Sequence, residues 1–182
     1  MVLVVKDCSK VDMKILRTPD ECFDNLEDYP FEPNYIDLEH HGQTLRMHYL
    51  DENSESKEVV LLMHGEPTWS YLYRKIIPIL VSNGKRVIAP DLIGFGKSDK
   101  PASREDFSYA NHIMWVEKLI KKLDLKNIIF FAQDWGGLIG LRLLAKYPDL
   151  YDGLVVSNSG LPVGSGATDG FMQWLEFSQS VE

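Results

Sequence analysis

Residues 127–147 read Asn-Ile-Ile-Phe-Phe-Ala-Gln-Asp-Trp-Gly-Gly-Leu-Ile-Gly-Leu-Arg-Leu-Leu-Ala-Lys-Tyr. The apolar, β-branched and aromatic run at 128–131 is typical of a buried strand, and from Leu138 the apolar residues recur at helical spacing. Asp134 lies between strand and helix, and small residues on both sides of it relieve the backbone crowding that so abrupt a turn produces. The spacing is that of a nucleophile elbow, with aspartate where a serine hydrolase carries serine.

Asp134 is the candidate nucleophile. An aspartate oxygen that attacks an sp³ carbon forms an alkyl ester, so the residue type indicates an alkylating substrate. A second interpretation is that Asp134 caps the following helix, because aspartate is a favoured N-cap and a helix N-terminus stabilises negative charge. Both roles are compatible. Capping leaves the small residues and the adjacent Trp135-Gly-Gly unexplained, so the pattern favours the nucleophile.

The rest of the chain alternates strands and helices around this unit. This order predicts an α/β fold with a mostly parallel, doubly wound sheet and right-handed crossovers. An antiparallel hairpin about His41-Gly42 opens the chain. We expect hairpin strands at 35–38 and 44–50, later strands at 58–63, 86–89 and 153–157, helices at 71–80, 111–123 and 169–179, and loops at 92–101 and 161–168.

Three predicted turns follow the carboxyl ends of strands, at 64–67, 90–98 and 133–136. Ligand sites in open α/β sheets lie outside these strand ends, so we expect the turns to converge on one crevice. The glycines at 94–96 do not make a phosphate loop, because they lack both the third glycine of a dinucleotide fingerprint and the Gly-Lys-Ser/Thr ending of a P-loop.

Composition excludes several classes of protein. The chain has 182 residues, a net charge of −8 and no basic cluster, which argues against a nucleic-acid partner. Cys8 and Cys22 have neither disulfide-framework nor metal-ligand spacing. No apolar run approaches the roughly 20 residues of a membrane span, and the first residues lack signal-peptide features. We therefore expect a cytoplasmic protein that has neither a metal nor a membrane partner.

Three motifs carry a family resemblance: His64-Gly-Glu-Pro-Thr-Trp-Ser-Tyr-Leu-Tyr-Arg74, Gly94-Phe-Gly-Lys-Ser-Asp-Lys-Pro101 and Gln133-Asp-Trp-Gly-Gly137. The chain resembles the haloalkane dehalogenases of the α/β-hydrolase fold, from residue 13 almost to its end. The likeness is to the subfamily whose second halide-binding residue is a tryptophan in the helical cap. Single motifs are shared with epoxide hydrolases, but the long run after His64 is more specific.

The resemblance implies that Asp134 displaces halide from a halogenated alkane and that water then hydrolyses the alkyl ester. It implies no metal or organic cofactor. The backbone N–H groups of Glu66 and Trp135 would form the oxyanion hole, and Trp135 and Trp174 would bind the leaving halide ion. In this fold the histidine at position 64 supports its loop rather than activating water.

The chain departs from the family pattern at its far end. The histidine base and the catalytic acid are expected later in the chain order than Glu182, and Asn158, where a sister subfamily keeps its acid, is an amide. We therefore expect the N-terminal part of a larger enzyme, inactive for turnover alone. The expected division is a possible extension at 1–12, the N-terminal part of the hydrolase core at 13–160 and the start of a helical cap at 161–182.

Three alternatives remain open from the sequence. An epoxide hydrolase shares the aspartate and Trp-Gly-Gly, although Gln133, often histidine in that class, and Trp174 favour halide. A luciferase-type monooxygenase resembles the dehalogenases but typically has asparagine at position 66. A non-catalytic relative that binds a small ligand or partner would explain the missing histidine, but it has no need of an aspartate at the elbow.

Overall fold

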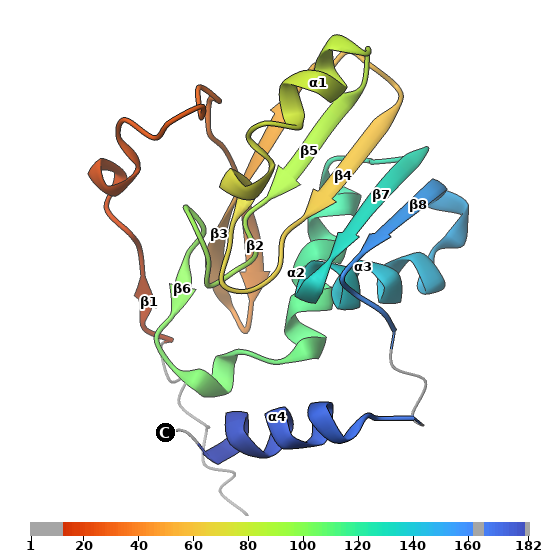
Figure 1. Ribbon diagram of the computed structural model, residues 1–182. Coiled ribbons are helices and arrows are strands. Elements are labelled where there is room, and N and C mark those ends of the chain that lie inside the picture. Colours follow the sequence, from red (N-terminus) through yellow and green to blue (C-terminus); the bar gives the residue numbers. More distant parts are fainter. Residues whose placement is uncertain (1–12, 162–165, 181–182) are drawn as a thin grey trace, which may run out of the picture.

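The computed structural model describes residues 13–161 and 166–180, which form a six-stranded sheet with the order β2-β3-β5-β4-β7-β8 (Figure 1). Antiparallel pairing joins β2, β3 and β5, and parallel pairing joins β5, β4, β7 and β8. The predicted α/β architecture with an opening hairpin is confirmed. The strands are β2 (Asn34–His40), β3 (Gln43–Glu52), β4 (Val59–Met63), β5 (Arg86–Pro90), β7 (Ile128–Gln133) and β8 (Tyr151–Ser157).

The opening hairpin turns where the sequence indicates. His41 and Gly42 both have positive φ, 50° and 77°, the combination that a tight two-residue hairpin turn requires. His40 therefore pairs with Gln43, and the ladder continues regularly to the pair Asn34 and Tyr49. The turn residues set this register.

The central strand β4 is buried on both faces, as its continuous apolar run predicts. Alternate side chains point to opposite faces. Leu61 and Met63 pack with α2 (Tyr109–Lys122) and α3 (Asp134–Lys146), while Val60 and Leu62 pack with Ile77 of α1 (Ile77–Ser82). The sheet thus lies between α1 on one face and the pair α2 and α3 on the other (Figure 1).

Two local predictions were wrong. The helix expected at 71–80 is a 3-10 turn at Ser70–Tyr73 followed by the short α1. Pro78 explains the break, because proline has no N–H to donate and fits only the first turn of a helix. The loop expected at 92–101 ends in β6 (Lys100–Pro101), which pairs with β1 (Ile15–Leu16) in a separate two-stranded sheet.

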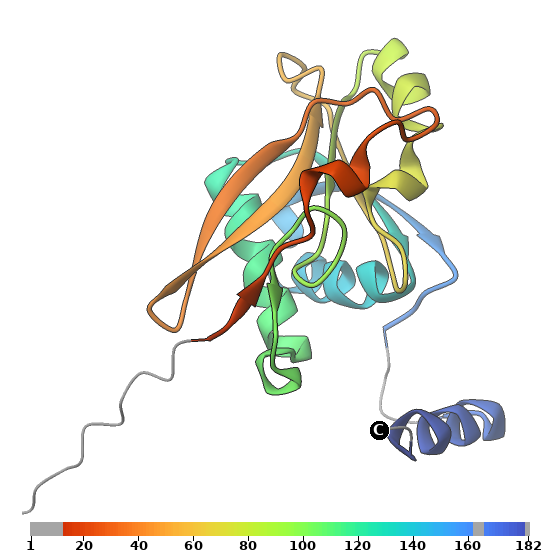
Figure 2. The same ribbon diagram turned by 90° about the vertical axis from the view of Figure 1, so that its left-hand side faces the viewer.

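The last two described elements, β8 and α4, are packed against less of the protein than the others. Among the described strands β8 pairs only with β7, and Leu154, Val155 and Val156 each expose 43–49% of their surface. None of the residues of α4 (Asp169–Ser180) is buried, and Figures 1 and 2 show this helix apart from the sheet. No helix within the described residues is long and apolar enough to cross a membrane. The extension predicted at 1–12 lies outside the described residues.

Candidate active site

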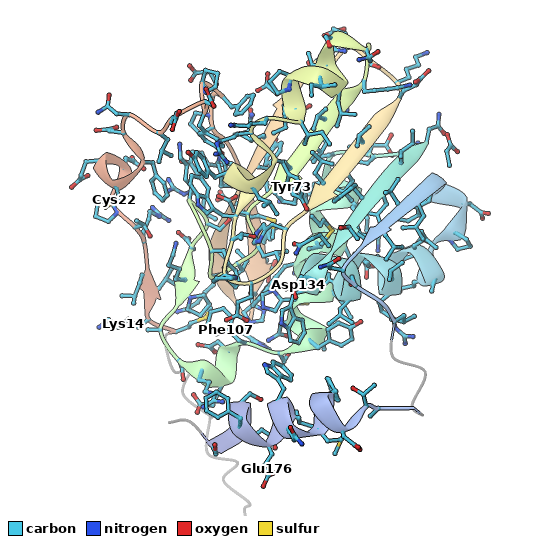
Figure 3. The ribbon with its side chains drawn as sticks, viewed as in Figure 1. Lys14, Cys22, Tyr73, Phe107, Asp134 and Glu176 are labelled. Atoms are coloured by element: carbon cyan, nitrogen blue, oxygen red, sulfur yellow. The ribbon has the colours of Figure 1, made fainter. Side chains whose placement is uncertain are left out.

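Asp134 stands where β7 ends and α3 begins, as Figure 3 shows. Its φ is +47°, a left-handed conformation that costs a non-glycine residue about 1–2 kcal/mol. The corner also demands close backbone contact, because a Cβ on Gly136 would overlap the carbonyl oxygens of Met63 and His64. The small residues of the motif therefore allow the strand-to-helix turn, and the half-buried Asp134 side chain projects from it.

The loop after β4 meets the Asp134 carboxylate. The backbone N–H of Glu66 donates to Asp134 Oδ1 at 2.9 Å, and the N–H of Gly65 donates to the side-chain oxygen of Gln133 at 3.1 Å. A Cβ on Gly65 would overlap the Asp134 carboxylate, so glycine is required by this approach. One carboxylate oxygen is thus held by the loop.

Trp135 follows at the start of α3. Its N–H belongs to the first helical turn, whose N–H groups have no partner within the helix. Trp135 is 36% exposed, and its ring centroid lies 6.4 Å from that of Tyr109. It borders a groove of about 570 Å³ between α2 and α3. The groove is lined chiefly by apolar groups, from residues that include Tyr109, Ile113, Trp135, Leu138 and Leu161, and Arg142 also lines it.

Trp174 lies on α4 and is 53% exposed. Its ring contact within the described chain is with Phe171, at 5.8 Å between centroids. The structure therefore brings together Asp134, Glu66 and Trp135, and it does not bring Trp174 against them. Residues 162–165, which lie in the chain between β8 and α4, are outside the described residues.

His64 is fully buried, and both of its ring nitrogens are occupied by backbone groups. Nδ1 donates to the carbonyl oxygen of Gly65 at 2.9 Å, while Nε2 accepts the N–H of Leu92 at 2.9 Å. Burial lowers its pKa, which keeps the ring neutral. His64 ties the loop after β4 to the loop after β5, which confirms its predicted supporting role.

Asp91 directly follows β5, in the turn expected at 90–98, and is a second carboxylate to which the sequence pattern gave no role. It is fully buried, and it accepts hydrogen bonds from His48 Nδ1 and from the N–H groups of Ser70 and Lys97, each at 2.8 Å. Burial alone raises its pKa, but the His48 ring and the N–H of Lys97 hold the pKa of Asp91 below its usual range. The only sequence signal was an aspartate directly after a buried strand.

The loops predicted to converge do converge. His64 joins the loops after β4 and β5, and Glu66 joins the loop after β4 to the elbow after β7. Within residues 13–161 and 166–180, no three histidine, cysteine or acidic side chains gather in positions that would hold a metal ion. The crevice offers one accessible carboxylate, backbone N–H donors and an indole beside an apolar groove.

Comparisons with known proteins agree with this geometry. The chain is 54% identical over 171 residues to a haloalkane dehalogenase of Psychrobacter cryohalolentis, covering 93% of this chain and 56% of that protein. A haloalkane dehalogenase of Mycolicibacterium paratuberculosis is 50% identical over 169 residues, covering 92% of this chain and 56% of its own length. The chain thus spans just over half of these relatives.

Among solved structures, the tetrameric haloalkane dehalogenase DpaA from Paraglaciecola agarilytica superposes with a TM-score of 0.86 at 43% identity, covering 93% of this chain and 57% of that one. The resemblance to haloalkane dehalogenases is confirmed by these relatives. The family model described as the alpha/beta hydrolase fold matches residues 58–180, two thirds of the sequence. The chain belongs to the α/β-hydrolase fold family.

Proposed function

We propose that this chain is the N-terminal part of an enzyme that hydrolyses haloalkanes to an alcohol and a halide ion. The observation that carries the proposal is the Asp134 carboxylate, projected from a strained elbow with one oxygen held by the Glu66 N–H at 2.9 Å. Identities of 50–54% to haloalkane dehalogenases support the choice of substrate class.

The proposed first step is a displacement at carbon. Because Oδ1 is held by Glu66, the other oxygen of Asp134 attacks the halogen-bearing carbon. The carbon–halogen bond breaks as the carbon–oxygen bond forms, and the halide leaves with the bonding electron pair. The carboxylate becomes an alkyl ester, and its negative charge passes to the halide.

The donors around Asp134 suit both stages of this reaction. The indole N–H of Trp135 is a donor only, and we assign it to the departing halide in the apolar groove. We assign the N–H groups of Glu66 and Trp135 to the oxyanion that develops when water attacks the ester carbonyl. Trp174 is proposed as the second halide donor, which requires α4 to approach Trp135 more closely than it does here.

Hydrolysis of the ester requires a base that activates water. His64 does not fill this role, because its two nitrogens are already bonded to backbone groups. His48 is fully buried against Asp91. We propose that the base and the acid belong to sequence beyond this chain, and that the chain alone stops at the alkyl ester.

A bromoalkane tests this proposal directly. The chain is incubated with 1-bromobutane while bromide release and intact protein mass are followed. We expect about one bromide per protein, a mass gain of one butyl group on the peptide containing Asp134, and no gain in Asp134→Asn. Absence of butylation would contradict the nucleophile, whereas sustained bromide release would contradict the missing base.

The alternatives give different results in the same assay. An epoxide hydrolase would be labelled at Asp134 by a terminal epoxide faster than by the bromoalkane. A luciferase-type monooxygenase or a non-catalytic relative would leave Asp134 unmodified by either compound. The proposed substrates are therefore small halogenated alkanes, with water as the second reactant.

We also propose the division expected from the sequence, with a hydrolase core at 13–160, the start of a cap at 161–182 and an extension at 1–12. The exposed apolar residues of α4, Phe171, Met172 and Phe177 among them, suit a cap helix whose partners lie elsewhere. Proteolysis that cuts first between 161 and 168 would support the division. The proposed location is the cytoplasm, which fractionation of the source cells would test.

A further inference from the structure

The chain segment that follows β8 bonds to the backbone of the elbow. The N–H of Asp134 donates to the carbonyl oxygen of Asn158 at 3.2 Å. The Ser159 hydroxyl donates to the carbonyl oxygen of Asp134 at 2.8 Å. The two residues after β8 therefore hold both backbone polar groups of the proposed nucleophile, from outside the strand and helix that carry it.

This contact is tightly fitted. A Cβ on Gly137, one turn into α3, would overlap the Ser159 side chain. Asn158 itself has a φ of +44°, a conformation that asparagine tolerates better than most residues. The segment thus turns sharply after β8, and this turn places the Ser159 hydroxyl in contact with the elbow.

The elbow needs such support. Left-handed backbone at a non-glycine residue persists only where the surrounding structure holds it in place. Gly65, Gly136 and Gly137 make room for the turn, but they supply no bond that keeps Asp134 in it. The bonds from Asn158 and Ser159 act directly on the strained residue.

We propose that Ser159 is a positioning residue for the Asp134 nucleophile, acting through the Asp134 carbonyl oxygen together with the Asn158 carbonyl. The proposal rests on the proposed function, because it assumes that Asp134 attacks carbon. Ser159 has no contact with the reacting oxygen in this arrangement. Its loss therefore slows alkylation without weakening binding of the haloalkane.

The test measures the rate of Asp134 butylation against 1-bromobutane concentration, expressed per folded molecule. In Ser159→Ala we expect the maximal rate to fall about fivefold, the effect of losing one hydrogen bond, at an unchanged half-saturating concentration. The matched control is Ser82→Ala, which removes a serine hydroxyl that donates to the carbonyl oxygen of Ile79 at 2.9 Å, far from the elbow. Its rate should equal that of the unaltered chain.

Gly137→Ala is a second, independent variant. The added methyl group displaces the Ser159 hydroxyl, so butylation slows, although alanine has the higher helix propensity. If Ser159→Ala and Gly137→Ala both react at the unaltered rate, or if Ser159→Ala lowers only the folded fraction, the positioning role is wrong. No butylation of the unaltered chain at Asp134 would instead overturn the proposed function, so the two failures are distinguishable.

Discussion

Asp91 and Asp134 follow the two strands that flank β4, and both lie at the carboxyl edge of the sheet. Asp91 is fully buried and accepts three hydrogen bonds, whereas Asp134 is half-buried and its carboxylate accepts one, from Glu66. A carboxylate whose oxygens are all occupied serves as a structural anchor. One that is partly exposed and keeps an oxygen without a hydrogen bond is able to attack a substrate.

The largest expected difference between Asp91 and Asp134 is in their contribution to the free energy of unfolding. Asp91→Asn breaks a buried pair and leaves the donors around it partly unsatisfied, so we expect the free energy of unfolding to fall by about 3–5 kcal/mol. Asp134→Asn should change it by less than about 1 kcal/mol, because that side chain reaches water. Urea denaturation of both variants measures the difference, and equal losses would contradict the assignment of roles.

The next effect is the pH dependence of stability, in which Asp91 and the histidine His112 act in different pH ranges. Burial lowers the pKa of His112 from 6.5 to about 4, so between these values the unfolded chain binds more protons than the folded one. The free energy of unfolding is therefore at its full value above pH 6.5, and it falls by up to about 3 kcal/mol as the pH drops to 4.

Asp91 contributes in a lower window, because its folded pKa lies below its ordinary value of 3.8. Its stabilisation is present above that value and is lost as the pH falls through the folded pKa. The slope of the unfolding free energy between pH 7 and 4.5 should therefore become shallower in His112→Phe, a change that keeps an aromatic ring beside Phe107 and Trp115. Part of the slope remains, because burial lowers the pKa of His64 as well. A slope equal to that of the unaltered chain would assign the titration to another group.

A smaller effect concerns the position of the Asp134 carboxylate. Gly65→Ala places a methyl group against the carboxylate and moves it, so the butylation rate should fall by about tenfold or more. Gly84→Ala is the control, because its φ is +78° but no atom lies near the added methyl group. The Gly84→Ala variant should lose about 1 kcal/mol of stability, and its butylation rate should equal that of the unaltered chain.

The smallest effect comes from a third carboxylate, Glu117 of α2. Burial alone raises its pKa, but hydrogen bonds from Lys121, Lys146 and Tyr147 lower the pKa of Glu117 to about 2. The two lysine side chains are more than half exposed, so water and salt screen these pairs. Glu117→Gln should cost less than about 1 kcal/mol in urea denaturation, and the loss should vanish at high salt.

Much of this arrangement could be predicted from local pattern. The apolar run at β7, the small residues about Asp134 and the turn residues at His41-Gly42 each indicate their local backbone. The convergence of three loops followed from the rule that parallel strands share a carboxyl edge. The helix at 71–80 was predicted wrongly because its apolar spacing outweighed Pro78, which local sequence chemistry already disfavours.

Local sequence therefore specifies the elbow, its aspartate and the alternation of strands and helices, since these depend on residues within a few positions of one another. The partners of the two aspartates depend on the tertiary fold. His48 lies 43 residues before Asp91, and Ser159 lies 25 residues after Asp134. Contacts at such separations leave no periodic trace in the chain, because they form only when β3, β5, β7 and β8 are packed into one sheet.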